Sequence, residues 1–410
     1  MILSGKNFTG KLTIEAPPSK SVCHRELIIR FLCGDTSYLA DSEEDNEDIL
    51  ATKSCLRSLN EASGLTNVRL FCNESGSTLR FMIPVACAYL LREGAEGNVT
   101  ELIFETKGRL FDRPIKELAD ALSPHGITIT KEEETRTIHA KGTMRAGKYV
   151  IDGSVSSQYI SGLLMALPLM KEACSIEVMG EMKSVHYLNL TLNALKKYNC
   201  PTVVEGNTFL PKQAGYETVT SLPEFHVEGD WSNGAFLLCL QQFSDIDVTN
   251  LNPDSAQGDK AILNFLQSAE EVRVNHLAAD SMWECKDIPD IVPYMAITAA
   301  FIYRKTEFHD IDRLRIKESD RVKAVREQLS AVGIKTEETD TTLTVYGSSA
   351  EVISSTLATP IKLSSYHDHR MAMCAILLAV ILKTDVELDD LTCVKKSYPE
   401  LISFVEKYLA

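Results

Sequence analysis

The chain has 410 residues, a formal net charge of −15 and an apolar content of 44%. Because a domain usually takes ~150 residues, this length predicts two or three domains. The acidic balance argues against binding to nucleic acid or to an acidic membrane, which need a positive surface, but a local cationic cleft can still hold small anions because charges are screened beyond ~8–10 Å.

One pattern recurs along the chain: a short polar turn rich in Gly, Ser, Asp or Pro precedes an apolar run of helical length. In chain order these turns lie at 17–21, 74–78, 152–157, 229–234, 288–290 and 366–370. The runs that follow are apolar on nearly all sides, which predicts helices enclosed by protein.

A second kind of segment lies between these turns. Apolar residues with the i, i+3, i+4, i+7 spacing of a half-buried helix occur at 115–122, 188–195, 322–332 and 401–408. Short β-branched runs, which predict strands, occur at 126–130, 149–151 and 342–346. Gly126 stands where the first of these helices should stop. The chain is therefore expected to be an α/β protein of six similar units, three in each of two lobes.

The polar turns also suggest a function. A helix start offers unpaired N–H groups and a partial positive charge, so several starts at one cleft would bind anions. Capping of each helix by Ser or Asp is the competing explanation for every turn. Cations near the turns favour an anion site, since arginine donates paired hydrogen bonds to phosphate and carboxylate. These cations are Lys20, Arg25, Arg80, Arg113, Arg313, Arg315, Lys317, Arg321, Arg370 and Lys396.

Carboxylates stand among these cations. Asp290 opens the fifth apolar run, and Glu318 directly follows Lys317. Either one can act as a general base if its pKa is suitably tuned. The alternatives are a helix cap for Asp290 and a surface ion pair for Glu318.

Other site types have little support. His367 and His369 have no cluster of further ligands around them, so we expect no metal. Neither phosphate-binding glycine fingerprint of nucleotide sites occurs. The eleven cysteines include no C-x-x-C pair, which is typical of reduced thiols in the cytoplasm. The first ten residues do not resemble a signal peptide, and no apolar stretch reaches the ~20 residues of a membrane span.

Seven short motifs in a fixed order carry a family resemblance. They are Pro-Ser-Lys-Ser at 18–21 with Arg25, Glu-Ser-Gly-Ser-Thr-Leu-Arg at 74–80, Asp-Arg-Pro at 112–114, Asp-Gly-Ser-Val-Ser-Ser-Gln at 152–158, Ile-Pro-Asp at 288–290, Arg-Ile-Lys-Glu-Ser-Asp-Arg at 315–321 and Asp-His-Arg-Met-Ala-Met at 368–373. From about residue 12 to its end, the chain resembles the 5-enolpyruvylshikimate-3-phosphate synthase family.

The resemblance implies a two-lobed enolpyruvyl-transferase fold with three βαβαββ units per lobe around buried helices. The N-terminal lobe would span 18–228, and the C-terminal lobe 1–17 plus 229–410, with hinges near 16–20 and 227–230. It implies lobe closure around the substrates, a monomer, and no metal or organic cofactor.

The resemblance also implies a 3-phosphoshikimate 1-carboxyvinyltransferase of the shikimate pathway, which leads to chorismate and the aromatic amino acids. The enolpyruvyl group of phosphoenolpyruvate would pass to the 5-hydroxyl of shikimate-3-phosphate through a tetrahedral intermediate, releasing phosphate. No nucleic-acid or membrane partner is implied.

The family's site residues carry over onto matching positions. Catalytic roles fall to Asp290, as base for the attacking hydroxyl, and to Glu318 and Lys20, as the groups that move the proton at the methylene carbon. Shikimate-3-phosphate would contact Lys20, Ser21, Arg25, Ser156, Ser157, Gln158, Ser184, Tyr187, Asp290 and Lys317. Phosphoenolpyruvate would contact Lys20, Gly76, Arg113, Gln158, Arg321, Arg370 and Lys396.

The chain departs from the family pattern at Glu74, His24 and His367, where asparagine is common, and at Arg313. Two other readings stay open. One is the sibling enzyme that uses UDP-N-acetylglucosamine as acceptor, which usually has Lys-Asn where this chain has Lys20 and Ser21. The other is a non-catalytic anion-binding homologue.

Overall fold

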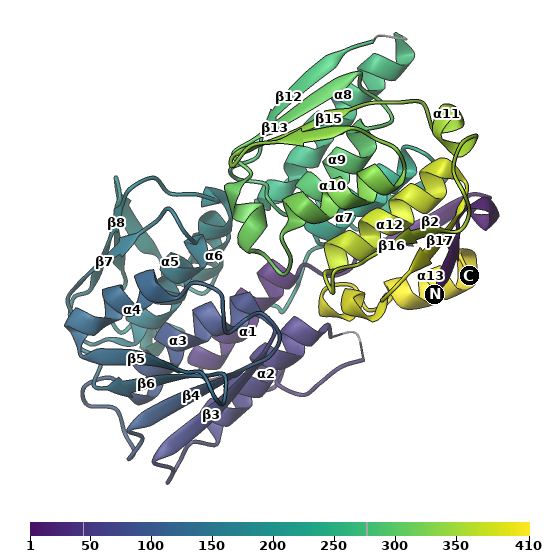
Figure 1. The fold of residues 1–410 in the computed structure, drawn as a ribbon. Coiled ribbons are helices and arrows are strands. Elements are labelled where there is room, and N and C mark those ends of the chain that lie inside the picture. Colours follow the sequence, from purple (N-terminus) through teal and green to yellow (C-terminus); the bar gives the residue numbers. More distant parts are fainter. Residues whose placement is uncertain (44, 276–277) are drawn as a thin grey trace. The chain divides into compact units, whose positions relative to one another are not determined.

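The computed structural model describes residues 1–43, 45–275 and 278–410, which form two compact units (Figure 1). Unit 1 comprises Met1–Ser19 and Glu228–Ala410, and unit 2 comprises Lys20–Val227. Each unit has its own hydrophobic core.

Unit 2 combines two four-stranded sheets with buried helices. Its helices are α1 (Lys20–Leu32), α2 (Glu47–Asn60), α3 (Gly76–Leu90), α4 (Lys116–Leu122), α5 (Ser157–Ala166) and α6 (Val185–Lys197). In spatial order, one sheet contains β3 (Asn67–Asn73), β4 (Glu101–Thr106), β6 (Thr137–Gly142) and β5 (Ile127–Glu132), and the other contains β7 (Lys148–Asp152), β8 (Ser175–Met179), β10 (Thr208–Pro211) and β9 (Thr202–Glu205). In both sheets the first two strands are parallel and the remaining pairs are antiparallel.

Unit 1 repeats this strand pattern once and adds two smaller sheets. Its helices are α7 (Trp231–Gln241), α8 (Ile262–Val274), α9 (Val292–Ala299), α10 (Arg321–Ala331), α11 (Ala350–Ser354), α12 (His369–Leu382) and α13 (Leu401–Tyr408). Its sheets, again in spatial order, are β12 (Asp280–Glu284), β13 (Lys305–His309), β15 (Thr342–Tyr346) and β14 (Thr336–Glu338); β1 (Ile2–Ser4), β17 (Asp385–Leu388) and β16 (Ile361–Leu363); and β11 (Ile246–Thr249) with β2 (Leu12–Glu15). The start of the chain therefore pairs with strands of its second half.

The expected α/β class is confirmed, whereas the count of six units stays a prediction. All residues of α12 are buried, as its continuous apolar run indicates. The apolar run 163–170 that follows the third polar turn is α-helical only in its first half. Helix α5 ends at Ala166 and continues as a tight 3-10 turn over Leu167–Leu169, because Pro168 lacks the N–H that an α-helix needs there.

The polar turns do cap helices. Ser75, Ser156, Asp230 and Asp368 each accept a hydrogen bond from a backbone N–H in the first turn of the helix that follows. Asp290 does not, because α9 begins at Val292 and its capping position is Ile291. The capping explanation is therefore wrong for Asp290.

The predicted stop of the 115–122 helix is confirmed. Gly126 follows α4 and a short 3-10 turn with a φ of +86°, the left-handed conformation that glycine adopts without strain. Within the described residues, no helix combines the length and the apolar character needed to cross a membrane.

Candidate active site

Arg321 is the centre of a buried charged cluster in unit 1. Its guanidinium group, in a residue 1% exposed, donates to Asp368 from Nε at 2.8 Å and from Nη2 at 3.1 Å. It also donates to Asp290 at 2.8 Å and to Glu318 at 3.0 Å. Since Asp368 caps α12 and Arg321 begins α10, these bonds fix two helix starts to each other.

Asp290 is held in its ionised form. Lys317 Nζ lies 3.2 Å from its Oδ1, in addition to the bond from Arg321. Burial alone would raise the pKa of Asp290, but Lys317, Arg321 and Arg370 together hold it well below its usual range. Burial lowers the pKa of Lys317 to about 8, although the Asp290 carboxylate opposes that shift.

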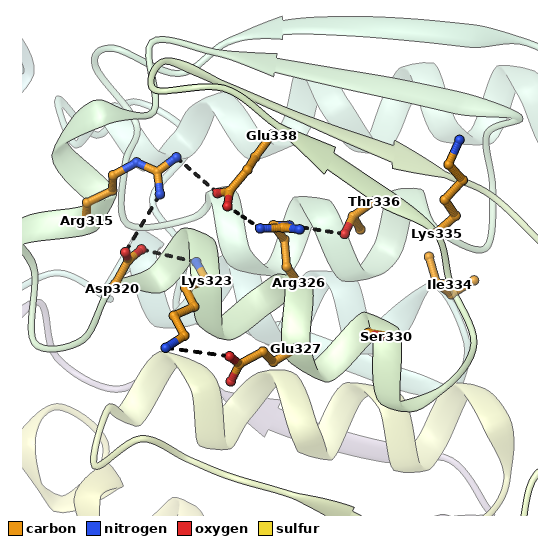
Figure 2. Close-up of a pocket in the computed structure, with 10 residues that line it drawn as sticks. All are labelled: Arg315, Asp320, Lys323, Arg326, Glu327, Ser330, Ile334, Lys335, Thr336 and Glu338. Atoms are coloured by element: carbon orange, nitrogen blue, oxygen red, sulfur yellow. Dashed lines mark hydrogen bonds and ion pairs between the residues drawn. The ribbon is translucent and has the colours of Figure 1, made fainter.

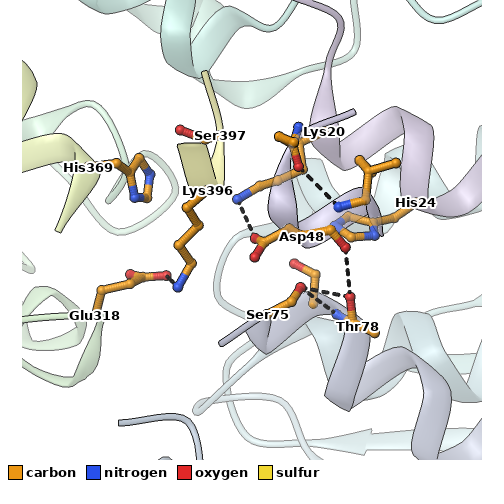
Figure 3. A network of polar contacts seen from close by, with 12 residues as sticks. Lys20, His24, Asp48, Ser75, Thr78, Glu318, His369, Lys396 and Ser397 are labelled. Carbon is orange, nitrogen blue, oxygen red and sulfur yellow. Dashed lines mark hydrogen bonds and ion pairs between the residues drawn. The ribbon is translucent and has the colours of Figure 1, made fainter. Parts of the chain in front are cut away.

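Glu318 bridges two cations of unit 1. Its Oε2 accepts from Arg321, and its Oε1 lies 3.3 Å from Lys396 Nζ (Figure 3). Both Glu318 and Lys396 are nearly buried. The alternative of an exposed surface pair is therefore wrong for Glu318.

Arg370 has spare capacity for a ligand. It is buried and donates from Nη1 to the Tyr294 hydroxyl at 2.9 Å and to Asn233 Oδ1 at 3.3 Å. Its Nε finds no acceptor among the residues that the structure describes. The turn at 229–234 therefore caps α7 and, through Asn233, also positions Arg370.

In unit 2, Lys20 begins α1 and its Nζ donates to Asp48 Oδ2 at 2.8 Å (Figure 3). Asp48 is buried in the first turn of α2, and its carbonyl accepts a bond from the Thr78 hydroxyl. Lys20 therefore has a buried carboxylate as a proton and charge partner.

Arg25 is held by neutral groups one turn further along α1. It donates to the carbonyls of Ser21 at 2.6 Å and Tyr187 at 2.8 Å, and to Thr191 Oγ1 at 2.7 Å. Burial lowers the pKa of Arg25 to about 10, so it stays charged at neutral pH. Ser184, which is also buried, directly precedes α6, the helix that carries Tyr187.

Two guanidinium groups flank the start of α3. A Cβ built on Gly76 would lie 2.6 Å from Arg113 Nη1 and 3.3 Å from Arg80 Nη1. Gln158 accepts from Arg80 at 2.8 Å and donates to Ser77 at 2.9 Å. A helix N-terminus beside two arginines is suited to bind an anion.

Two further predicted contacts, Ser156 and Ser157, directly precede Gln158 in the chain. Ser156 caps α5 and Ser157 begins it, and both are buried. Helix α5 packs closely on α3, because Gly162 leaves room for the Arg80 carbonyl, which a Cβ would approach to 2.7 Å.

Not every cation of the 313–321 segment belongs to the Arg321 cluster. Arg315 turns away, into a groove of about 580 Å³ beside α10 and β14, where it pairs with Glu338 at 3.0 Å (Figure 2). Arg326 and Lys323 in the same groove pair with Glu338 and Glu327. These pairs leave the groove little net charge with which to attract an anion.

Sequence reasoning missed four residues that position the predicted ones: Asp48, Asn233, Tyr294 and Asp368. Asp48 ends an acidic run that is typical of a solvated loop, and Asp368 has the pattern of an ordinary helix cap. Tyr294 lies within an apolar run. None of them carries a local signal of its ion-pair or hydrogen-bond partner. Among the described residues, no group of three or more His, Cys, Asp or Glu is placed to hold a metal ion.

Each unit thus presents several buried cations, together with carboxylates suited to proton transfer, which is the equipment of an enzyme acting on small anions. A family model described as EPSP synthase (3-phosphoshikimate 1-carboxyvinyltransferase) matches residues 4–405. The chain belongs to this family.

Curated relatives agree with this assignment. The chain is 31% identical to a 3-phosphoshikimate 1-carboxyvinyltransferase of Clostridium beijerinckii, covering 96% of this chain and 95% of the relative. It is 33% identical to the protein of the same name from Clostridium kluyveri, covering 94% and 92%.

Solved structures show the same fold at lower identity. The EPSP synthase from Acinetobacter baumannii matches with a TM-score of 0.68 at 17% identity, covering all of this chain and 98% of that one. The enolpyruvyl transferase NikO from Streptomyces tendae matches with a TM-score of 0.64 at 12% identity, covering 100% and 97%.

Proposed function

We propose that this chain transfers the enolpyruvyl group of phosphoenolpyruvate to the 5-hydroxyl of shikimate-3-phosphate and releases inorganic phosphate. The observation that carries the proposal is Asp290, an ionised carboxylate held between Lys317 and Arg321. A carboxylate in this state can accept the proton of an attacking hydroxyl.

The reaction needs a proton at the methylene carbon and a countercharge at the neighbouring carbon. Protonation of C3 of phosphoenolpyruvate makes C2 electron-poor, and the 5-hydroxyl oxygen then bonds to C2 while Asp290 takes its proton. Glu318 and Lys20 deliver the proton to C3 and later remove one from it. Each lies next to a partner of opposite charge, Lys396 for Glu318 and Asp48 for Lys20. Cleavage of the C2–O bond expels phosphate, and loss of a C3 proton restores the double bond.

The remaining residues bind the two anions, which repel each other and therefore need cations from the protein. We assign Ser21, Arg25, Ser156, Ser157, Gln158, Ser184, Tyr187 and Lys317 to shikimate-3-phosphate. We assign Gly76, Arg113, Gln158, Arg321, Arg370 and Lys396 to phosphoenolpyruvate. The Nε of Arg370 supports its assignment because it finds no acceptor among the described residues.

We further propose that units 1 and 2 act as the two lobes of the enzyme, which works as a monomer in the cytoplasm. The eleven free cysteines fit a reducing compartment.

The test measures phosphate release from phosphoenolpyruvate with each of two acceptors. Release with shikimate-3-phosphate, and none with UDP-N-acetylglucosamine, is expected. The opposite preference would assign the chain to the sibling activity, and no release with either acceptor would leave only anion binding.

A further inference from the structure

The loop between β4 and α4, residues 107–115, carries Arg113 and is held by two cations from the neighbouring β5–β6 hairpin. Lys131 lies on β5, and Arg136 lies in the turn before β6. Lys131 Nζ is 5.0 Å and Arg136 Cζ 4.9 Å from the centroid of the Phe111 ring. Phe111 is only 1% exposed, because its ring belongs to the hydrophobic core of unit 2 and these long side chains lie over it. Lys131 and Arg136 are called the loop clamp below.

The loop clamp also binds the backbone of the loop. Lys131 Nζ donates to the carbonyl of Phe111 and, at 3.3 Å, to the carbonyl of Arg113 itself. Arg136 Nη2 donates to the Gly108 carbonyl and to Asp112 Oδ2, both at 2.8 Å. Bonds to charged donors are stronger than neutral ones, so both ends of the 108–113 segment are fixed.

The opposite side of the loop contacts the turn that starts α3. A Cβ on Gly108 would lie 2.0 Å from Glu74 Oε1, so the Glu74 side chain fits against Gly108 only because that residue is glycine. Two residues after Glu74, Gly76 contacts the guanidinium of Arg113 in the same way. The position of Arg113 over the start of α3 therefore depends on how the loop is held from both sides.

We propose that Lys131 and Arg136 are positioning residues for phosphoenolpyruvate: they fix the loop so that the Arg113 guanidinium stays beside Gly76. The proposal rests on the proposed role of Arg113 in binding this substrate. It assigns a role in the reaction to two cations on a hairpin that carries none of the motif residues. A shift of about 1 Å in such a group is enough to lose a large part of its effect on the rate.

The test compares Lys131→Met and Arg136→Met with the wild type, with KM measured separately for each substrate. Each variant is expected to raise the KM for phosphoenolpyruvate roughly tenfold while the KM for shikimate-3-phosphate stays within about twofold. Lys131→Arg, which keeps a long cationic donor, is expected to restore most of the affinity. Lys141→Met is the matched control, since Lys141 lies on neighbouring β6 and pairs with Glu101 outside the loop.

A double-mutant cycle separates positioning from a general loss of structure. In an Arg113→Met background, Lys131→Met should have little further effect, because both changes act through the same guanidinium. An equal effect in both backgrounds, an equal rise of both KM values, or an unchanged KM in both clamp variants would overturn the proposal. The two clamp variants are assayed independently, so one that fails to fold leaves the other to decide.

A result that contradicts the proposed function can be distinguished from one that contradicts only the role of the loop clamp. In the first case the wild-type chain itself would release no phosphate with shikimate-3-phosphate. A wild-type chain that is active, with clamp variants that match it, would overturn only the inference about Lys131 and Arg136.

Discussion

Arg321 of unit 1 and Arg25 of unit 2 are both buried but are held in opposite ways. In unit 1, Arg321 is surrounded by three carboxylates, those of Asp290, Glu318 and Asp368. In unit 2, Arg25 donates to two carbonyls and a hydroxyl. In the first arrangement the positive charge is neutralised by carboxylates of the protein. In the second the acceptors are uncharged, so the positive charge is not neutralised by them.

This difference separates two tasks. A guanidinium whose acceptors are neutral keeps its full charge for an anionic ligand, which fits the proposed role of Arg25 in binding. A guanidinium among carboxylates instead keeps those carboxylates ionised and in place, which suits proton transfer. Arg370 combines the two, since its acceptors are neutral although it raises the acidity of Asp290.

The largest effect is expected at Asp290. Asp290→Asn removes the base without much change in size, so kcat should fall roughly a thousandfold. Binding of shikimate-3-phosphate, measured by calorimetry, should change little. Asp280→Asn, on the exposed pair with Arg304, is the control and should keep wild-type turnover. Near-normal turnover of the Asp290 variant would remove this residue from the base role.

The comparison itself is tested by matched arginine variants. Arg321→Met leaves buried Asp368 without its arginine and removes one of the two cations from Asp290 and from Glu318, so unfolding free energy should fall by about 3–5 kcal/mol. Arg25→Met leaves only neutral acceptors, with an expected loss of about 1–3 kcal/mol. Its main effect should be on shikimate-3-phosphate, whose Kd should rise at least tenfold. Chemical denaturation and calorimetry measure the two quantities, and equal stability losses would contradict the distinction.

Titration of Lys317 should make the activity of the enzyme depend on pH. Its pKa of about 8 in the folded protein lies below the ordinary lysine value. As the pH rises through 8, Lys317 should lose its proton and its hold on shikimate-3-phosphate, so kcat/KM for that substrate should decline on the alkaline side.

The free energy of unfolding should instead increase as the pH rises above 8. The unfolded chain binds more protons than the folded one between pH 8 and the ordinary lysine pKa, so this group adds stability as the pH rises. Lys317→Met should abolish both the alkaline decline near pH 8 and this stability increment. A decline that persists in the variant would have to come from another group.

The smallest effect is expected at Gly76. In Gly76→Ala, the new Cβ would meet the end of Arg113, a flexible side chain that can move aside. The KM for phosphoenolpyruvate should rise about five- to tenfold, with little change in stability or in the KM for shikimate-3-phosphate. An unchanged KM for phosphoenolpyruvate would show that Arg113 does not bind that substrate from this position.

Much of the fold was accessible from the sequence because its signals are local. A capping side chain bonds a backbone N–H two or three residues away, so Ser75 and Asp368 mark helix starts in the sequence itself. The continuous apolar run of α12 and the strand at 342–346 are equally local. The family motifs could be recognised because each one is a short contiguous segment.

The partners of the charged residues were decided only by the tertiary structure. Arg321 meets Asp290 and Asp368 from 31 and 47 residues away, and Lys20 meets Asp48 across 28. Arg315 and Lys317 are only two residues apart, yet Arg315 faces a surface groove of ion pairs and Lys317 faces the Asp290 carboxylate. The sequence by itself determined which helices begin with polar capping turns and which family the chain resembles. Which cations pair with carboxylates was decided by the tertiary structure, because ion pairing depends on separation in space and not on position along the chain.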